Sequence, residues 1–130
     1  MLTEEGKSEL SELQGAEDET MKSFAGCTSA VVLVTRNEVY CANAGDSRSV
    51  MAQRNTAKDL SVDHKPDDPG ELARIEASGN YVVEGRVNGR LALSRALGDF
   101  EYKNNADLSP KKQAVSPHPD LKMETITPDT

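Results

Sequence analysis

The chain has 130 residues, of which 36% are hydrophobic and 4% aromatic, and it contains no tryptophan. This length fits one domain, whose small core has to be packed by Val, Leu, Ile and Ala, a composition that favours strands. The net charge is −7, and positions 1–20 carry −6 of it, with seven acidic residues against one lysine. An acidic end on a nearly neutral remainder argues against a nucleic-acid or anionic-membrane partner, since both require clustered basic residues.

The cysteine content indicates the compartment. Cys27 and Cys41 occur without a secretory signal, so we expect free thiols in a reducing environment, cytoplasmic or nuclear. No stretch approaches the roughly 18 consecutive apolar residues that a membrane-spanning helix needs. The sequence therefore predicts a soluble intracellular protein.

Two parts of the chain differ in character. Residues 1–23 are rich in Glu, Ser, Gly and Thr, which predicts an acidic and mostly flexible segment, and residues 24–130 read as the globular portion. Within that portion, segments 31–35, 38–44 and 47–53 predict consecutive antiparallel strands. Because segment 31–35 is apolar at every position except its last, we expect it to be buried on both faces in an inner sheet.

A helix is expected after these strands. A polar loop at 54–58 and a short strand at 59–62 lead into a stretch punctuated by proline. Asp68 can cap a helix that begins at Pro69, and Glu71 stands three residues after Asp68, as in a capping box. We therefore predict a helix starting at Pro69.

The rest of the chain predicts short strands and loops. Segments 81–83 and 86–87 read as a hairpin-like pair, and Asn88-Gly89 is a favourable two-residue turn. Residues 100–119 are expected to be mostly loop, and 121–126 a final strand. The predicted elements are thus mainly strands with one central helix.

The turn at Gly45-Asp46 is the strongest candidate for chemistry. Glycine takes positive φ readily and Asp tolerates it, so the pair suits a sharp reversal after an apolar strand. A carboxylate at this corner could hold a metal ion, or it could be an ordinary solvated turn residue. His64 and His118 have no neighbours at metal-binding spacing, so we read them as ordinary loop histidines.

Five blocks of sequence occur in the order seen in the metal-dependent serine/threonine protein phosphatases of type 2C. From about residue 26 to residue 130, the chain resembles that family. The blocks are Gly26-Cys27-Thr28-Ser29-Ala30, Asn43-Ala44-Gly45-Asp46-Ser47-Arg48, Asp63-His64-Lys65-Pro66, Glu71 through Arg74-Ile75, and Arg86-Val87-Asn88-Gly89 with Leu91 through Asp99.

The resemblance implies a fold and a reaction. The fold is α+β, a partial β-sandwich with flanking helices, as part of a four-layer α-β-β-α arrangement. The reaction is hydrolysis of phosphoserine or phosphothreonine in a phosphoprotein substrate by water held on Mg²⁺ or Mn²⁺. Members of this family hold two such ions between the edges of the β-sandwich.

The resemblance also implies roles for individual residues. Asp46 matches a carboxylate of an additional, weaker metal site. Arg86 matches the end of the flap beside the active site, where it could bind substrate phosphate or pair with an acidic neighbour; an exposed Arg without function is the alternative. Thr28 matches a threonine near metal-bound waters, with a local turn as its alternative, and Asp99 has a structural place. No catalytic residue is assigned.

Other motifs of the family are not found in this sequence. Its upstream half should bring Arg-x-x-Met-Glu-Asp and Asp-Gly-His-Gly, and its downstream half Asp-Gly-x-Trp-Asp and a late Asp-Asn. We therefore expect the central portion of a longer phosphatase that is inactive alone, either with or without bound metal. A non-catalytic phosphatase-like interaction module and an acidic-tailed scaffold remain alternatives, and exposed strand edges predict self-association.

Overall fold

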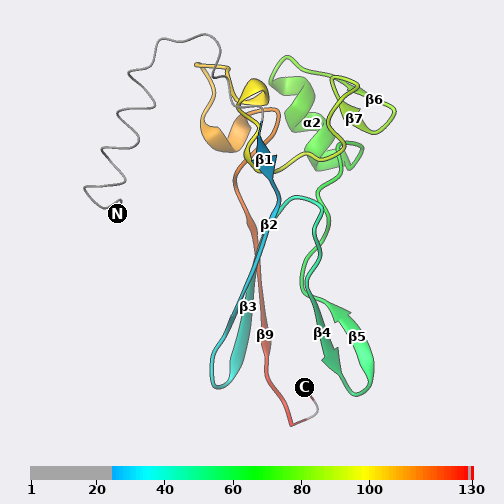
Figure 1. Ribbon diagram of the computed structural model, residues 1–130, viewed down its shortest axis with the longest axis vertical. Coiled ribbons are helices and arrows are strands. Elements are labelled where there is room, and N and C mark those ends of the chain that lie inside the picture. The colour runs from blue at the N-terminus through cyan, green and yellow to red at the C-terminus, as the bar shows by residue number, and fades with distance from the viewer. Residues whose placement is uncertain (1–24, 129) are drawn as a thin grey trace, which may run out of the picture.

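The computed structural model describes residues 25–128 and 130. The molecule is elongated, with α2 (Pro69–Ala77), β6 (Val82–Val83) and β7 (Arg86–Val87) at one end and two arms of strands at the other (Figure 1). The predicted flexible segment at 1–23 lies outside the described residues. The α+β class expected from the sequence is confirmed.

The larger arm is a three-stranded antiparallel sheet. It consists of β2 (Ser29–Val34), β3 (Glu38–Ala44) and β9 (Asp120–Thr125), with β3 in the centre. Val31 lies opposite Ala42, which in turn lies opposite Leu121. The predicted strands at 31–35, 38–44 and 121–126 are confirmed to within two residues.

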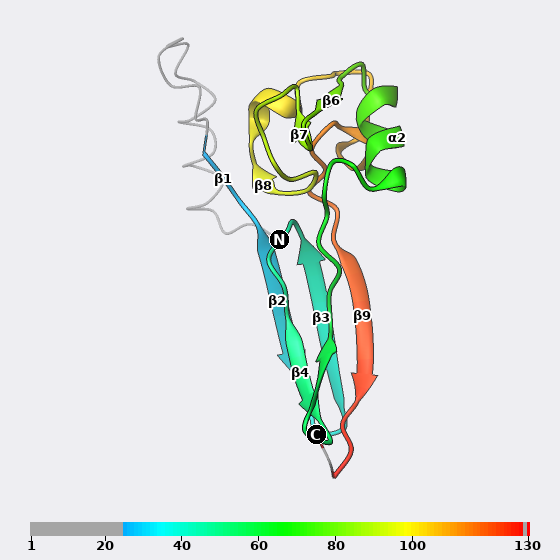
Figure 2. The same ribbon diagram turned by 90° about the vertical axis from the view of Figure 1, so that its right-hand side faces the viewer.

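The smaller arm is the hairpin of β4 (Val50–Gln53) and β5 (Thr56–Asp59), which runs beside the sheet (Figure 2). Arg54 and Asn55 between them have φ of 52° and 57°, the left-handed values of a two-residue hairpin turn. The loop predicted at 54–58 is therefore wrong. The tight turn lets the return strand start at Thr56, earlier than a polar composition suggests.

Burial in the sheet arm also differs from the prediction. Val39 and Cys41 of β3 pack with Met51 and Leu60 in a small core. By contrast, Val31, Leu33 and Val34 are 59%, 60% and 64% exposed. The prediction that segment 31–35 is buried on both faces is wrong for the described structure, because β2 is an edge strand whose faces are largely open.

A second core lies at the helical end. Ile75 of α2 and Val87 of β7 are fully buried together with Ala96, Tyr102, Ala114 and Val115. The segment 100–119 is mostly loop as predicted, apart from two short turns of 3-10 helix at Phe100–Tyr102 and Pro110–Lys112. Loop residues therefore complete this core around the helix.

The helix begins at Pro69 as predicted, but the capping box is wrong. Asp68 is the N-cap residue, yet its carboxylate accepts a hydrogen bond from the Lys65 amide (3.1 Å) rather than from the helix. Glu71 is buried instead of reaching back to Asp68. The reason is that charged partners elsewhere in the chain hold its carboxylate.

Two glycines allow the chain to cross itself above the sheet. β1 (Gly26–Cys27) pairs with β8 (Leu97–Gly98). A side chain at Gly26 would overlap the Asp99 carboxylate, and one at Gly98 would overlap the Ala25 carbonyl oxygen.

Both cysteines are free. Across residues 25–128, the structure contains no helix with the length and apolar character needed to cross a membrane.

Candidate functional site

The corner at Gly45-Asp46 is held from several sides. The Gly45 amide donates to Nδ1 of His64 (3.0 Å), and the Gly45 carbonyl accepts from the His64 amide and from Nδ2 of Asn43, both at 3.1 Å. Gly45 has φ of +122°, and a Cβ there would lie 2.5 Å from Thr28 and 2.9 Å from the Arg95 carbonyl. A residue with a side chain would clash here, so the corner requires glycine.

Asp46 presents its carboxylate from this fixed corner. Its side chain is 26% exposed, and Oδ2 accepts from Nζ of Lys65 at 2.5 Å. Lys65 follows His64 directly, so one segment both braces the corner and supplies a cation to the carboxylate. The oxygen is therefore within reach of positive charge and open to solvent.

A polar network lies behind the corner, buried at His64, Glu71 and Ser94 and exposed at Asp120. His64 is 4% exposed, and its Nε2 lies 3.0 Å from Oδ2 of Asp120. The other oxygen of Asp120 accepts from Nη1 of Arg95 (2.8 Å). Arg95 in turn donates through Nη2 to Glu71 (2.7 Å), whose second oxygen accepts from the Ser94 hydroxyl (2.6 Å). We call these five residues the polar network: His64, Asp120, Arg95, Glu71 and Ser94.

The charges in the polar network compensate one another. Burial by itself would raise the pKa of Glu71, but hydrogen bonds from Arg95, Ser94 and Arg74 outweigh it and leave that pKa below its ordinary value. Burial likewise opposes the hydrogen bonds from His64 and Arg95, which still lower the pKa of Asp120. Both carboxylates are therefore ionised at neutral pH and neutralise the buried guanidinium groups.

The predicted substrate residue, Arg86, lies elsewhere. It is exposed on β7, and its Nη1 donates to the Arg90 carbonyl oxygen at 2.9 Å within the same hairpin. Asp46 instead contacts Lys65, and among the described residues no interaction joins Arg86 to Asp46. The structure therefore does not bring the two predicted site residues together.

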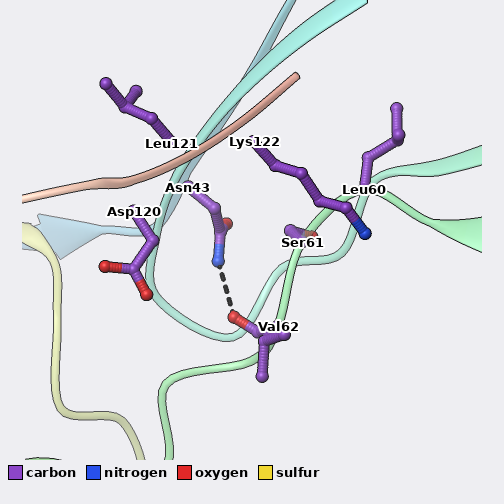
Figure 3. A pocket seen from close by; sticks show the side chains of 7 residues that line it. All are labelled: Asn43, Leu60, Ser61, Val62, Asp120, Leu121 and Lys122. Carbon is purple, nitrogen blue, oxygen red and sulfur yellow. Dashed lines mark hydrogen bonds between the residues drawn. The ribbon is translucent and has the colours of Figure 1, made fainter. Parts of the chain in front are cut away.

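A pocket of about 310 Å³ opens beside the polar network (Figure 3). Asn43 points between β9 and the segment 60–62, where its Nδ2 donates to the Val62 carbonyl oxygen at 3.0 Å. Its Oδ1 is buried without a partner among the described residues. Asp120 and Lys122 both line the pocket and give it one charge of each sign. Asp120 is therefore accessible to solvent from the pocket.

The fit of these residues to a divalent metal is partial. Mg²⁺ and Mn²⁺ prefer several oxygen ligands. Within the described residues, no group of three or more His, Cys, Asp and Glu side chains lies close enough to hold an ion. Thr28 does not cap a local turn; its hydroxyl lies 2.6 Å from that of Ser47. Asp46 thus fits as one ligand of a larger cage, and the described residues do not form a complete one.

The residues that brace the corner were missed by sequence reasoning. His64 was read as an ordinary loop histidine, but it is buried and bonded through both ring nitrogens. A usable signal is present in Arg95, a charged residue in the run 91–97, whose other residues are three Leu, two Ala and one Ser. A charge in such a run is buried only with a partner, so Arg95 should have prompted a search for acidic partners.

The chain was compared with known proteins. The family model for Protein phosphatase 2C matches residues 3–130. Protein phosphatase 2C 1 of Paramecium tetraurelia is 51% identical over 98% of this chain and 42% of its own length, and Protein phosphatase 2C homolog 2 of Schizosaccharomyces pombe is 53% identical over 81% and 29%. The chain thus spans about two fifths of the length of the Paramecium relative.

Solved structures give the same result for the fold. A phosphatase from a pathogenic strain of Toxoplasma gondii superposes with a TM-score of 0.64 at 42% identity, covering 66% of this chain and 27% of that one. Serine-threonine phosphatase 2C from Toxoplasma gondii gives a TM-score of 0.70 at 24% identity, covering 96% and 44%. With a family match over nearly the whole sequence, this chain belongs to the protein phosphatase 2C family.

Proposed function

We propose that the protein containing this chain is a protein serine/threonine phosphatase that uses Mg²⁺ or Mn²⁺, and that the 130 residues alone are inactive. The observation that carries the proposal is Asp46, a carboxylate on a fixed corner with a cation on one oxygen. Family membership supports the reaction class. The substrate class is phosphoproteins carrying phosphoserine or phosphothreonine.

The chemistry follows from the charge of the ions. When bound, such ions lower the pKa of coordinated water and neutralise charge on the phosphoryl oxygens. Asp46 would contribute one oxygen ligand, and Lys65 would have to give up its contact with Oδ2 for an ion to bind there. The corner would hold the carboxylate in place for the ion.

Arg86 is proposed as a substrate-binding residue. One of its donors is used by the Arg90 carbonyl, and a guanidinium has five. The side chain is exposed, so its remaining donors can reach a phosphate group on a peptide. This role predicts that Arg86→Ala raises KM for a phosphopeptide more than it lowers kcat.

The test uses a phosphothreonine peptide in Mn²⁺ buffer. The 130-residue chain and the polypeptide of the extended reading frame are purified and compared, and only the longer one should show turnover. Asp46→Asn in the longer polypeptide should weaken its dependence on Mn²⁺, whereas the exposed Asp107→Asn serves as the matched control. Turnover by the 130-residue chain itself would contradict the proposal.

A non-catalytic interaction module is the second candidate. The observation that favours it is that no group of three or more His, Cys, Asp and Glu side chains within the described residues could hold an ion. Calorimetry on the longer polypeptide separates the two candidates. Tight Mn²⁺ binding supports the enzyme, and absence of binding together with absence of turnover supports the module.

We also propose that the 130-residue chain self-associates through one face of its sheet. Directly opposed residues of the three strands share a face, and the face formed by six of them is apolar and spans all three strands. We call it the open sheet face: Val31, Leu33, Tyr40, Ala42, Leu121 and Met123. Leu121 is 79% exposed on it, and soluble monomers rarely expose a contiguous apolar patch larger than a few hundred Å².

Sedimentation tests this proposal. The chain should sediment as a concentration-dependent dimer or larger species, and Leu33→Lys with Leu121→Lys should shift it to monomer. Val62→Lys is the matched control, because Val62 is 75% exposed but lies outside the sheet. A sharp monomeric profile of the unsubstituted chain at high concentration would remove the proposal.

A further inference from the structure

We propose that His64 is the residue that positions Asp46 for its metal ion, with Asp120 orienting the His64 ring. The inference rests on the proposed function, since it concerns the same carboxylate. His64 makes no contact with the Asp46 side chain among the described interactions. It acts on the backbone immediately before Asp46 and is therefore a positioning residue.

The first step is the hold of His64 on Gly45. The ring accepts from the Gly45 amide at 3.0 Å, and the His64 main-chain amide donates to the Gly45 carbonyl at 3.1 Å. One residue thus fixes the peptide groups on both sides of the Gly45 α-carbon. The second of these peptide groups includes the Asp46 nitrogen, so its orientation sets the direction in which the carboxylate leaves the corner.

The second step is the orientation of the ring. Because Nδ1 accepts a hydrogen bond from Gly45, the proton of the neutral ring lies on Nε2, which faces Asp120 at 3.0 Å. A ring turned over would lose both interactions at once. Asp120 is itself held by Arg95, which is anchored on Glu71 in the buried end of the molecule.

The third step explains why a metal ligand needs such support. Ligands have to be held within about 0.5 Å of the productive geometry by neighbours that are themselves fixed. Asp46 lies two residues beyond the end of β3. It follows Gly45, whose φ of +122° other residues rarely adopt. Without the ring acceptor, the Gly45 amide would be buried and unpaired, so the corner would move to recover a partner.

Two variants with amide side chains distinguish the roles of the two ring nitrogens of His64, Nδ1 and Nε2. In His64→Asn the shorter side chain puts its oxygen near the place of Nδ1 and keeps the acceptor for Gly45. In His64→Gln the longer side chain puts its amide near Nε2 and keeps a donor for Asp120, but it loses the acceptor. Both are made in the 130-residue chain and studied by NMR with two readouts, Gly45 amide exchange and paramagnetic broadening at Asp46 by Mn²⁺.

We expect His64→Gln to exchange the Gly45 amide about three- to tenfold faster, as loss of one hydrogen bond implies, and to reduce the broadening at Asp46. His64→Asn should restore both readouts toward those of the unsubstituted chain. The Ser94 amide, which donates to the His64 carbonyl at 3.1 Å, is the internal control for local packing. Asp46→Asn is the control for the origin of the broadening.

The outcomes separate this inference from the proposed function. Gly45 amide exchange that is the same in His64→Gln and in the unsubstituted chain overturns the positioning role and leaves the proposed function standing, whether or not the 130-residue chain binds Mn²⁺. Broadening that is present but equal in His64→Gln overturns the positioning role alone, as does equal behaviour of the Gln and Asn variants. Should His64→Gln not fold, Asp120→Ala takes its place, because the Asp120 side chain is 63% exposed; unchanged Gly45 exchange in that variant also overturns the inference.

Discussion

The two ends of the molecule differ in which residues they bury besides their apolar cores. The polar network lies inside the helical end, where Glu71 and Ser94 are buried. The most apolar stretch of the sequence, in β2, lies on the open sheet face and at the sheet edge, largely exposed. For Glu71 and for Leu33, hydrophobicity alone would predict the opposite burial.

The difference shows what each region requires. A buried charge is stable only when every partner is present, and in the polar network each carboxylate has a guanidinium partner. An apolar strand needs only a surface to cover it, and any apolar surface of suitable shape will do. The helical end is therefore complete within the described residues, whereas the sheet end can accept a further layer.

The largest expected effect comes from breaking the polar network. Glu71→Gln removes the carboxylate that pairs with both Arg74 and Arg95, and of the two only Arg95 keeps another carboxylate partner, Asp120. We therefore expect the free energy of unfolding to fall by about 3–5 kcal/mol. Urea denaturation measures it. Glu76→Gln, at an exposed position on the same helix, is the control and should change stability by less than about 0.5 kcal/mol.

The next largest expected effect is a difference in stability loss between similar truncations at the two ends of the molecule. Ile75→Ala removes a fully buried side chain from the core of the helical end and should cost about 2–5 kcal/mol. Leu33→Ala, on the open sheet face, should cost less than about 0.5 kcal/mol when unfolding is measured at low protein concentration. Similar losses at both positions would mean that the sheet face is covered in solution.

The smallest expected effect is on the pH dependence of the stability that Glu71 contributes. The pKa of Glu71 is lowered in the folded chain from an ordinary value of 4.5. Its ionised form therefore stabilises the fold fully above about pH 4.5, and this stability is lost as the pH falls through the lower folded pKa. Glu71→Gln should make the unfolding free energy fall less steeply below pH 4.5, as followed by urea midpoints across a pH series; an unchanged slope would contradict the assignment.

Sequence reasoning succeeded where the pattern is local. The strands at 38–44 and 121–126, the start of the helix at Pro69, and the turn at Gly45 follow from alternation, proline and glycine. The candidate site was predicted only in part. Asp46 follows from the Gly45-Asp46 corner and from the resemblance to the family, and Arg86 from the resemblance alone. Both stay predictions, whereas the network that braces the Asp46 corner is not predicted by the sequence.

The missing parts depend on partners distant in sequence. Glu71 was expected to cap its own helix, an interaction over three residues, but its carboxylate bonds to Arg95, 24 residues away. His64 meets Asp120 across 56 residues. Nothing in the immediate neighbourhood of either residue distinguishes these partners from other charged side chains.

The sequence by itself determined the family, the order of the elements and the glycine corner that carries Asp46, because backbone conformation follows from the residues at and next to each position. Tertiary structure alone decided that the charges are inside and that the valines of β2 are exposed. Burial depends on which surfaces other segments cover, and that is settled only when residues far apart in the chain come together.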